Sequence, residues 1–368
     1  MALLKSLIIA SEKAGNIARI CRQSKHLFEL LVQEKEDAES NPRFVQDFKT
    51  LADVLIQEMV KYEIGQQFPI LKNQIKGEEN NSFCNKLGEV INVKIQEHAN
   101  ETAELLEIVL NGDSNAAKLL AEEVHRNIKL EDVNLCSTVL PESDEHEYGD
   151  VGIWIDPIDS TAEYINGKEL VEESGIHVNG LGCVTVLIGV YNKADGTPVM
   201  GIVNQPFSEL KEDKWHGCCH WGLIGHTTSA CCNCKFSTVP KNIVCISSSE
   251  DQSVKDKLKA NGFTLVEAAG AGYKMLTVIT GLSDAYVLSK GTTFKWDTCG
   301  PQAILKSLGG DVTNFEDAVK NCKMPVTYIN DMESGDEIKV VKYCNAEGII
   351  AYKDELILKS IIEAVKEQ

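Results

Sequence analysis

The amino-acid sequence predicts an α+β amino-terminal part followed by an α/β carboxy-terminal part. Two observations predict this fold class. Helical stretches and then longer apolar strands fill the chain up to about residue 235, whereas short strands and helices alternate after Pro240. At 368 residues the chain is longer than one typical domain. The change in pattern therefore predicts two domains, residues 1–238 and 239–368.

The amino-terminal part begins with helices. Apolar residues recur at helical spacing over residues 3–21 and again over 54–62. The second helix is introduced by Thr50-x-x-Asp53, a capping box in which each end residue can satisfy a backbone amide of the other. Residues 102–110 and 115–125 predict two further helices.

Four strands are expected next, over residues 151–155, 184–190, 199–203 and 214–224. The Asp-Gly pair at 195–196 predicts a hairpin turn between the second and the third strand. The alternating part then predicts strands over 243–247, 263–266, 285–288 and 349–352, with helices over 254–260, 273–280, 301–308 and 355–365.

Composition excludes some partners. The chain carries 36 basic and 55 acidic residues, a net charge of −19, so it has no general attraction for nucleic acid or for an anionic membrane. No apolar run reaches the eighteen or so residues of a membrane span. Thirteen scattered cysteines and the absence of a secretory signal predict free thiols in a reducing, cytoplasmic compartment.

The segment DPIDST, which begins at Asp156, carries the strongest chemical pattern. Its proline favours a turn after a strand, and the turn can place Asp156 and Asp159 on one side with the Ile158 carbonyl between them. Such oxygen ligands suit Mg²⁺. Ser160 and Thr161 can then cap a helix whose first amides face a phosphate. A capped surface turn is the commoner meaning of this motif when it stands alone.

Three more acidic positions strengthen the metal interpretation. Asp53 lies in the first turn of a predicted helix, Glu78 and Glu79 follow a glycine, and Asp297 lies between a predicted strand and a predicted helix. Each has a simpler explanation by itself: helix capping, a solvated loop and a favourable helix-end charge, respectively. Together with Asp156 they form a set of carboxylates that could meet in the fold.

Two segments could contact a ligand without a metal. Gly270-Ala271-Gly272 lies between a strand and a helix, where glycines allow close backbone approach, and Lys274 follows it. The spacing is not that of a Walker A loop, and a tight turn explains the glycines about as well. Ser249 lies in a run of serines that ends another strand.

The segments 47–53, 77–79, 156–161 and 296–301 occur together in this order, and in this respect the chain resembles the lithium-sensitive, Mg²⁺-dependent phosphatase superfamily. Its members include inositol monophosphatases, bisphosphate nucleotidases and fructose bisphosphatases. The resemblance is strongest to the branch that acts on inositol polyphosphates, in part because Ser160 stands where most relatives carry glycine. It implies a layered αβαβα sandwich of the inositol monophosphatase and sugar phosphatase type.

The resemblance also implies roles for the matched residues. Glu78, Asp156 and the Ile158 carbonyl would hold a first metal ion, and Asp156, Asp159 and Asp297 a second. A third, weaker site, where Li⁺ could compete, would be lined by Asp53 and Glu79. Glu78, Thr161 and Asp53 would be catalytic, with Thr161 paired to Glu78 to orient the attacking water. Substrate would be contacted by Asp159, Ser160, Thr161, Ser249, Gly270 and Lys274. In this assignment the first domain carries most metal ligands, and the second carries Asp297 and most substrate contacts.

The activity implied is hydrolysis of the 1-phosphate of inositol 1,4-bisphosphate, and secondarily of inositol 1,3,4-trisphosphate, by metal-activated water without a phosphoenzyme. Two or three Mg²⁺ ions would be needed, Li⁺ would inhibit, and the enzyme would be a monomer. The alternatives are a 3′(2′),5′-bisphosphate nucleotidase and a non-catalytic inositide-binding protein.

Two features do not fit this interpretation. Asp251 is acidic where the resemblance implies a basic substrate contact. Cysteines and histidines crowd residues 216–234, but the spacing lacks a paired C-x₂-C frame, so zinc is the weaker explanation.

Overall fold

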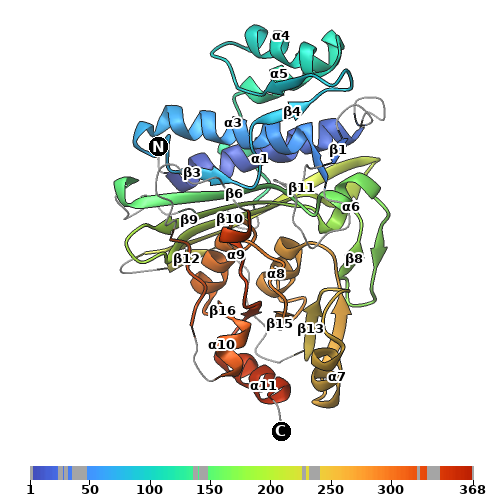
Figure 1. Ribbon diagram of the computed structural model, residues 1–368, viewed down its shortest axis with the longest axis vertical. Coiled ribbons are helices and arrows are strands. Elements are labelled where there is room, and N and C mark those ends of the chain that lie inside the picture. The colour runs from blue at the N-terminus through green and yellow to red at the C-terminus, as the bar shows by residue number, and fades with distance from the viewer. Residues whose placement is uncertain are drawn as a thin grey trace.

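The computed structural model describes residues 3–23, 28, 32–34, 48–135, 140, 148–225, 229–231, 241–320, 324–329 and 340–366. The predicted domain boundary at 238–239 lies outside these residues, as do His226, Cys232 and Cys234 of the cysteine- and histidine-rich stretch. Five layers, helix–sheet–helix–sheet–helix, follow one another along the long axis of the molecule (Figure 1). The αβαβα architecture implied by the sequence is therefore confirmed.

The larger sheet has the strand order β12-β11-β10-β9-β6-β3. Its pairings are antiparallel except that between β3 and β6, and the predicted hairpin joins β9 and β10, with Gly189 opposite Gly201. One face is covered by α1 and α3, whose apolar residues are almost completely buried. The bounds are β3 Ile75–Gly77, β6 Val151–Asp159, β9 Thr185–Asn192, β10 Pro198–Lys211, β11 Lys214–Ile224, β12 Ser229–Cys231, α1 Leu3–Gln23 and α3 Leu51–Gln67.

The other face of this sheet receives α8 (Ala271–Ile279) and α9 (Lys295–Leu308), which lie between the two sheets (Figure 1). Glycines on three strands let α9 approach closely. A Cβ atom at Gly201 would come within 2.0 Å of the Gly300 carbonyl oxygen, and one at Gly222 within 2.7 Å of the Ile304 Cα. Because Asp297 is in the first turn of α9, this close packing fixes its position relative to β6.

The smaller sheet has the order β14-β13-β15-β17-β16. Strands β13, β14 and β15 are parallel, and β17 runs antiparallel to β15 and β16. Its outer face is covered by α7, α10 and α11 (Figure 1). The bounds are β13 Ile243–Ile246, β14 Thr264–Glu267, β15 Ala285–Leu288, β16 Asp311–Asn314, β17 Ile349–Tyr352, α7 Gln252–Ala260, α10 Phe315–Val319 and α11 Glu355–Val365.

Short elements complete the described chain. Helices α4 and α5 form a hairpin beyond the α1–α3 layer, next to β4 (Figure 1). The bounds are β1 Val32–Glu34, β2 Phe48–Thr50, β4 Ser82–Cys84, β5 Val90–Asn92, α4 Ala99–Val109, α5 Ser114–His125, α6 Thr161–Asn166, β7 Leu170–Val171 and β8 His177–Asn179. No helix within the described ranges is both long and apolar enough to cross a membrane.

The sequence predicted most elements, and three strands (214–224, 285–288 and 349–352) and the last helix (355–365) match to the residue. Several predictions were wrong in extent. Strand β10 does not end at Val203 but continues to Lys211, where it is still paired with β11. Strand β6 does not end at Ile155, because after an irregularity its pairing with β9 resumes at Asp159. Helix α9 begins at Lys295 rather than at Pro301, so Asp297 lies inside the helix rather than before it. The short elements β16 and α10 were not predicted.

Candidate active site

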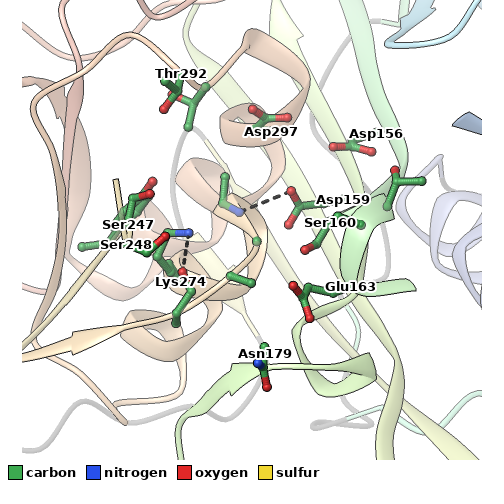
Figure 2. A pocket seen from close by; sticks show the side chains of 18 of the residues that line it. Asp156, Asp159, Ser160, Glu163, Asn179, Ser247, Ser248, Lys274, Thr292 and Asp297 are labelled. Atoms are coloured by element: carbon green, nitrogen blue, oxygen red, sulfur yellow. Dashed lines mark hydrogen bonds between the residues drawn. The ribbon is translucent and has the colours of Figure 1, made fainter. Parts of the chain in front are cut away.

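A pocket of about 650 Å³ opens between the two sheets. Its walls come from six separate segments: Glu78 after β3, the end of β6 with the start of α6, β8, the loop after β13, the stretch from β14 into α8, and the stretch from β15 into α9. Figure 2 shows Asp156 and Asp159 on one side of this pocket and Ser247 and Ser248 on the opposite side. Strand ends and helix starts thus gather polar groups that are far apart in the sequence, from Glu78 to Asp297.

Three buried carboxylates form the centre of the site. Asp156, Asp159 and Asp297 each place an oxygen within 4.8 Å of the others (Figure 2). Burial raises the pKa of Asp156 well above its usual range, and the nearby charges of Glu78 and of the other two aspartates raise it further. The pKa of Asp297 is raised in the same way, by burial and then by Asp159 and Glu78. A cation in this space would relieve the repulsion.

Local hydrogen bonds hold these carboxylates in place. An Asp297 oxygen accepts the Phe294 amide at 2.8 Å at the start of α9, and an Asp156 oxygen accepts the Ile158 amide at 3.1 Å. Asp159 accepts the Gly272 amide at the start of α8 at 2.8 Å. Burial raises the pKa of Asp159, and the charge of Lys274 opposes that shift. Each side chain is therefore oriented before any ligand arrives.

The turn after Asp159 has a strained residue. Ser160 adopts φ +73° and ψ +49°, the left-handed region in which glycine is favoured. Helix α6 begins at Thr161, as the sequence predicted, but the Ser160 hydroxyl makes no capping bond. The Thr161 hydroxyl donates to the Ile158 carbonyl at 3.1 Å. Its pairing with Glu78 stays a prediction.

Glu78 lines the pocket, and the backbone of the next residue, Glu79, is fixed from α3. The Gln57 side chain accepts the Glu79 amide at 3.0 Å and donates to the Glu79 carbonyl. A Cβ atom at Gly77 would come within 2.0 Å of the Gln57 Oε1 atom, so the glycine before the two glutamates makes room for this clamp. Gln57 was missed by the sequence reasoning, although it lies one helical turn after Asp53.

Asp53 forms the capping box that the sequence predicted. Its carboxylate accepts the Thr50 amide at 2.7 Å and the Thr50 hydroxyl at 2.6 Å. Both Asp53 and Glu79 are buried, at 1% and 7% exposure, and neither lines the pocket. The pocket brings together all the other predicted site residues: Glu78, Asp156, Ile158, Asp159, Ser160, Thr161, Ser249, Gly270, Lys274 and Asp297.

Lys274 is the one basic residue among the described residues that line the pocket. Its ammonium donates to the Ala268 carbonyl at 3.0 Å (Figure 2) and lies 5.0 Å from the centre of the Tyr286 ring. Burial lowers the pKa of Lys274, and the charge of Asp159 opposes this shift. Gly270, at φ +72°, begins the helix that carries this lysine; a Cβ atom there would come within 2.8 Å of the Cys183 carbonyl oxygen.

The structure bears on the two features that did not fit the sequence interpretation, Asp251 and the cysteine- and histidine-rich stretch. Asp251 is exposed, does not line the pocket, and caps α7 by accepting the Ser253 amide at 2.8 Å. Within the described ranges, the aspartate triplet is the one group of at least three His, Cys, Asp or Glu side chains with metal-binding spacing. The described part of the stretch 216–234 therefore holds no such cluster.

Comparison with known proteins agrees with this geometry. The model of the inositol monophosphatase family matches residues 4–357. An inositol polyphosphate 1-phosphatase of Mus musculus is 42% identical in an alignment of 378 positions that covers 95% of this chain and 93% of that protein. A 3′(2′),5′-bisphosphate nucleotidase 1 of Mus musculus is 32% identical, but over 49% of this chain and 55% of its own length. The crystal structure of the extragenic suppressor protein SuhB from Bartonella henselae shares the fold, with a TM-score of 0.54 and 14% identity over 99% of this chain and 98% of that one. The chain therefore belongs to the inositol monophosphatase family.

Proposed function

We propose that this chain is a Mg²⁺-dependent phosphomonoesterase that hydrolyses the 1-phosphate of inositol 1,4-bisphosphate, and secondarily that of inositol 1,3,4-trisphosphate. One observation carries the proposal. Three buried carboxylates with oxygens within 4.8 Å of one another line the same pocket as a buried lysine and a serine-rich loop. Likeness to an inositol polyphosphate 1-phosphatase over nearly the whole of both chains supports the substrate class.

The donor set fits Mg²⁺. Its atoms are carboxylate oxygens and a backbone carbonyl oxygen, which are hard ligands. The triplet consists of aspartates alone, so it offers no nitrogen or sulfur ligand. Buried like charges at this spacing are unfavourable until a proton or a cation joins them. When bound, Mg²⁺ ions would supply charge neutralisation and a more acidic water. Asp156, Asp159, Asp297, Glu78 and the Ile158 carbonyl would hold two of them.

The chain's own residues then have separate tasks. Thr161, which is hydrogen-bonded at the Ile158 carbonyl, would orient the attacking water together with Glu78. Lys274 and the amides around Gly270 would bind the phosphate ester and its ring, with Ser160 and Ser249 as further contacts. Asp53 and Glu79, which lie outside the pocket lining, would contribute to a third and weaker cation site open to Li⁺ competition.

A bisphosphate nucleotidase is the second candidate, because that class of relative also matches this chain, although over about half of it. A non-catalytic inositide-binding protein is the third. It would be expected to have lost a metal carboxylate, and all the predicted positions are filled. We further propose that the enzyme is a cytoplasmic monomer; size-exclusion chromatography with light scattering would test its oligomeric state.

The test is phosphate release from inositol 1,4-bisphosphate, inositol 1-phosphate and adenosine 3′,5′-bisphosphate, each with and without Mg²⁺ and Li⁺. We expect Mg²⁺-dependent, Li⁺-suppressed release from the first. Asp156→Asn should lower kcat about 100-fold or more, the loss typical of removing one charge-stabilising group. Asp256→Asn, on the exposed face of α7, is the matched control. Preference for the nucleotide would overturn the substrate, and no release from any ester would overturn the activity.

A further inference from the structure

The pocket is short of positive charge for a substrate with two phosphates. Among the described residues that line it, one is a lysine and six carry carboxylates: Glu78, Asp156, Asp159, Glu163, Glu267 and Asp297. Bound Mg²⁺ would offset the carboxylates that hold it and would attract one phosphate. Lys274 already donates to the Ala268 carbonyl and faces the charge of Asp159. A second phosphate, which carries close to two negative charges, therefore needs another cation.

The loop after β13 forms the opposite wall, and two lysines reach it from outside the pocket lining. Lys255 donates to the Ser248 carbonyl at 2.9 Å, but it also pairs with Glu267 at 2.7 Å and is buried. Lys290 donates to the Ser249 carbonyl and is exposed. In the described part of the chain no carboxylate pairs with Lys290. Its ammonium has three donors, of which this bond uses one.

Lys290 is held at this wall by the fold. It follows β15, which is parallel to and directly beside β13, so the loops at their carboxyl ends are neighbours. The Glu250 carboxylate fastens one loop to the other by accepting the Ser289 amide at 2.9 Å as well as the Ser289 hydroxyl. Glu250 itself is only 5% exposed. The residue before Lys290 is therefore anchored, and the Lys290 ammonium reaches the carbonyl of Ser249, a residue that lines the pocket.

We propose that Lys290 binds the second phosphate of the substrate and sets the preference for a bisphosphate over a monophosphate. This inference rests on the proposed function and extends it to a residue outside the motifs. It also accounts for Asp251, which caps α7 at the place where a basic contact was expected. In this proposal the positive charge comes instead from Lys290, in the loop after the neighbouring strand β15.

The experiment compares kinetics on inositol 1,4-bisphosphate and inositol 1-phosphate for the wild type, Lys290→Gln, Lys290→Arg and the control Lys359→Gln, an exposed lysine on α11. Lys290→Gln should raise KM for the bisphosphate about tenfold with little change in kcat, the pattern of a contact made equally in ground and transition states. Kinetics on the monophosphate should not change. Lys290→Arg should stay close to the wild type, and Asp251→Lys in the Lys290→Gln background should recover part of the loss.

Other results would overturn the inference. Equal losses on both esters would assign Lys290 a structural role in the loop, and unchanged kinetics on the bisphosphate would remove it from substrate binding. Both outcomes leave the proposed function intact, because the wild type is active in each. A wild type that releases phosphate from neither ester would overturn the proposed function and this inference with it.

Discussion

Asp297→Asn should stabilise the metal-free protein while weakening its response to Mg²⁺. The substitution keeps the shape of the side chain and an oxygen that can accept the Phe294 amide, but it removes one charge from the buried triplet. Without a cation that charge is buried and faces the charges of Asp159 and Glu78, which is unfavourable. The carboxylates that would create the metal site therefore reduce the stability of the empty protein, as functional sites commonly do.

The magnitude follows from the geometry. At 4.8 Å and an effective dielectric constant near 20, two unit charges repel by about 3.5 kcal/mol. Proton uptake limits the real penalty, because the pKa values of Asp156 and Asp297 are raised. A gain of about 2 kcal/mol is expected, which for 368 residues at about 2.1 cal/mol/K each corresponds to about 3 °C in Tm.

The sign of the pH dependence follows from the same shifts. A carboxyl whose pKa is raised by folding binds protons that the unfolded chain releases, so its contribution to stability is lost as pH rises above about 4. The advantage of Asp297→Asn over the wild type in EDTA should therefore grow with pH until the folded-state pKa values are passed. Adding Mg²⁺ at 100 times its dissociation constant should stabilise the wild type by about 2.7 kcal/mol and the variant by less.

Calorimetric or fluorescence-monitored unfolding in EDTA and in Mg²⁺ measures both effects, with Asp256→Asn as the surface control. The reasoning fails if Asp297→Asn is less stable than the wild type in EDTA, or if Mg²⁺ stabilises both proteins equally. The first result would mean that the triplet is not under charge strain. The second would mean that Asp297 holds no metal.

Three further substitutions test how the site is positioned. Thr50→Ala should lower the free energy of unfolding by about 1 kcal/mol in urea, because the capping box of α3 is lost. Gly270→Ala should cost about 2 kcal/mol or more and reduce turnover, since the added Cβ meets the Cys183 carbonyl at 2.8 Å and the backbone has a positive φ, +72°. Lys353→Met should cost about 3–5 kcal/mol in the same assay, because it leaves the buried Asp284 carboxylate without its 2.5 Å partner.

Each of these has a matched control. Thr50→Ser keeps the hydroxyl and should be nearly neutral. Gly262→Ala has a similar φ, +85°, with no atom within 4 Å of the added Cβ, so it isolates backbone strain from the clash at Gly270. Lys359→Met removes an exposed lysine and should cost little. Equal losses in a variant and its control would contradict the corresponding argument.

The sequence predicted the fold where one physical signal dominates. The strand at 214–224 and the helix at 355–365 match to the residue because their ends coincide with a change in apolar periodicity. The end of β6 was predicted too early because Pro157 was expected to terminate the strand. In the folded chain the irregularity lies between Asp156 and Asp159, and pairing resumes with Thr185. Local propensity could not show that a partner strand would be present.

The residues of the candidate site also fall into two groups, those that the sequence could predict and those that it could not. Residues that carry charge within a motif, such as Asp156 and Asp297, could be found from sequence because their chemistry is specific. Gln57 could not, since a glutamine on a helix signals nothing until Gly77 is seen to make room for it. Lys290 is a similar case: its significance comes from the parallel pairing of β13 and β15, which no local pattern contains.

Gly77, Gly270 and the strained Ser160 show how the fold produces this site. At the first two positions a Cβ atom would collide with a neighbouring oxygen, that of the Gln57 side chain or of the Cys183 carbonyl, and at the third a left-handed turn directs the chain from β6 into α6. Serine adopts this turn at a cost that glycine would avoid. The close approaches at Gly77 and Gly270 and the turn at Ser160 therefore allow β6, α6 and α8 to bring their polar groups into one volume. Catalytic precision in such a pocket depends on these backbone positions as much as on the carboxylates, because a shift of about 1 Å in a positioned group can cost about 100-fold in rate.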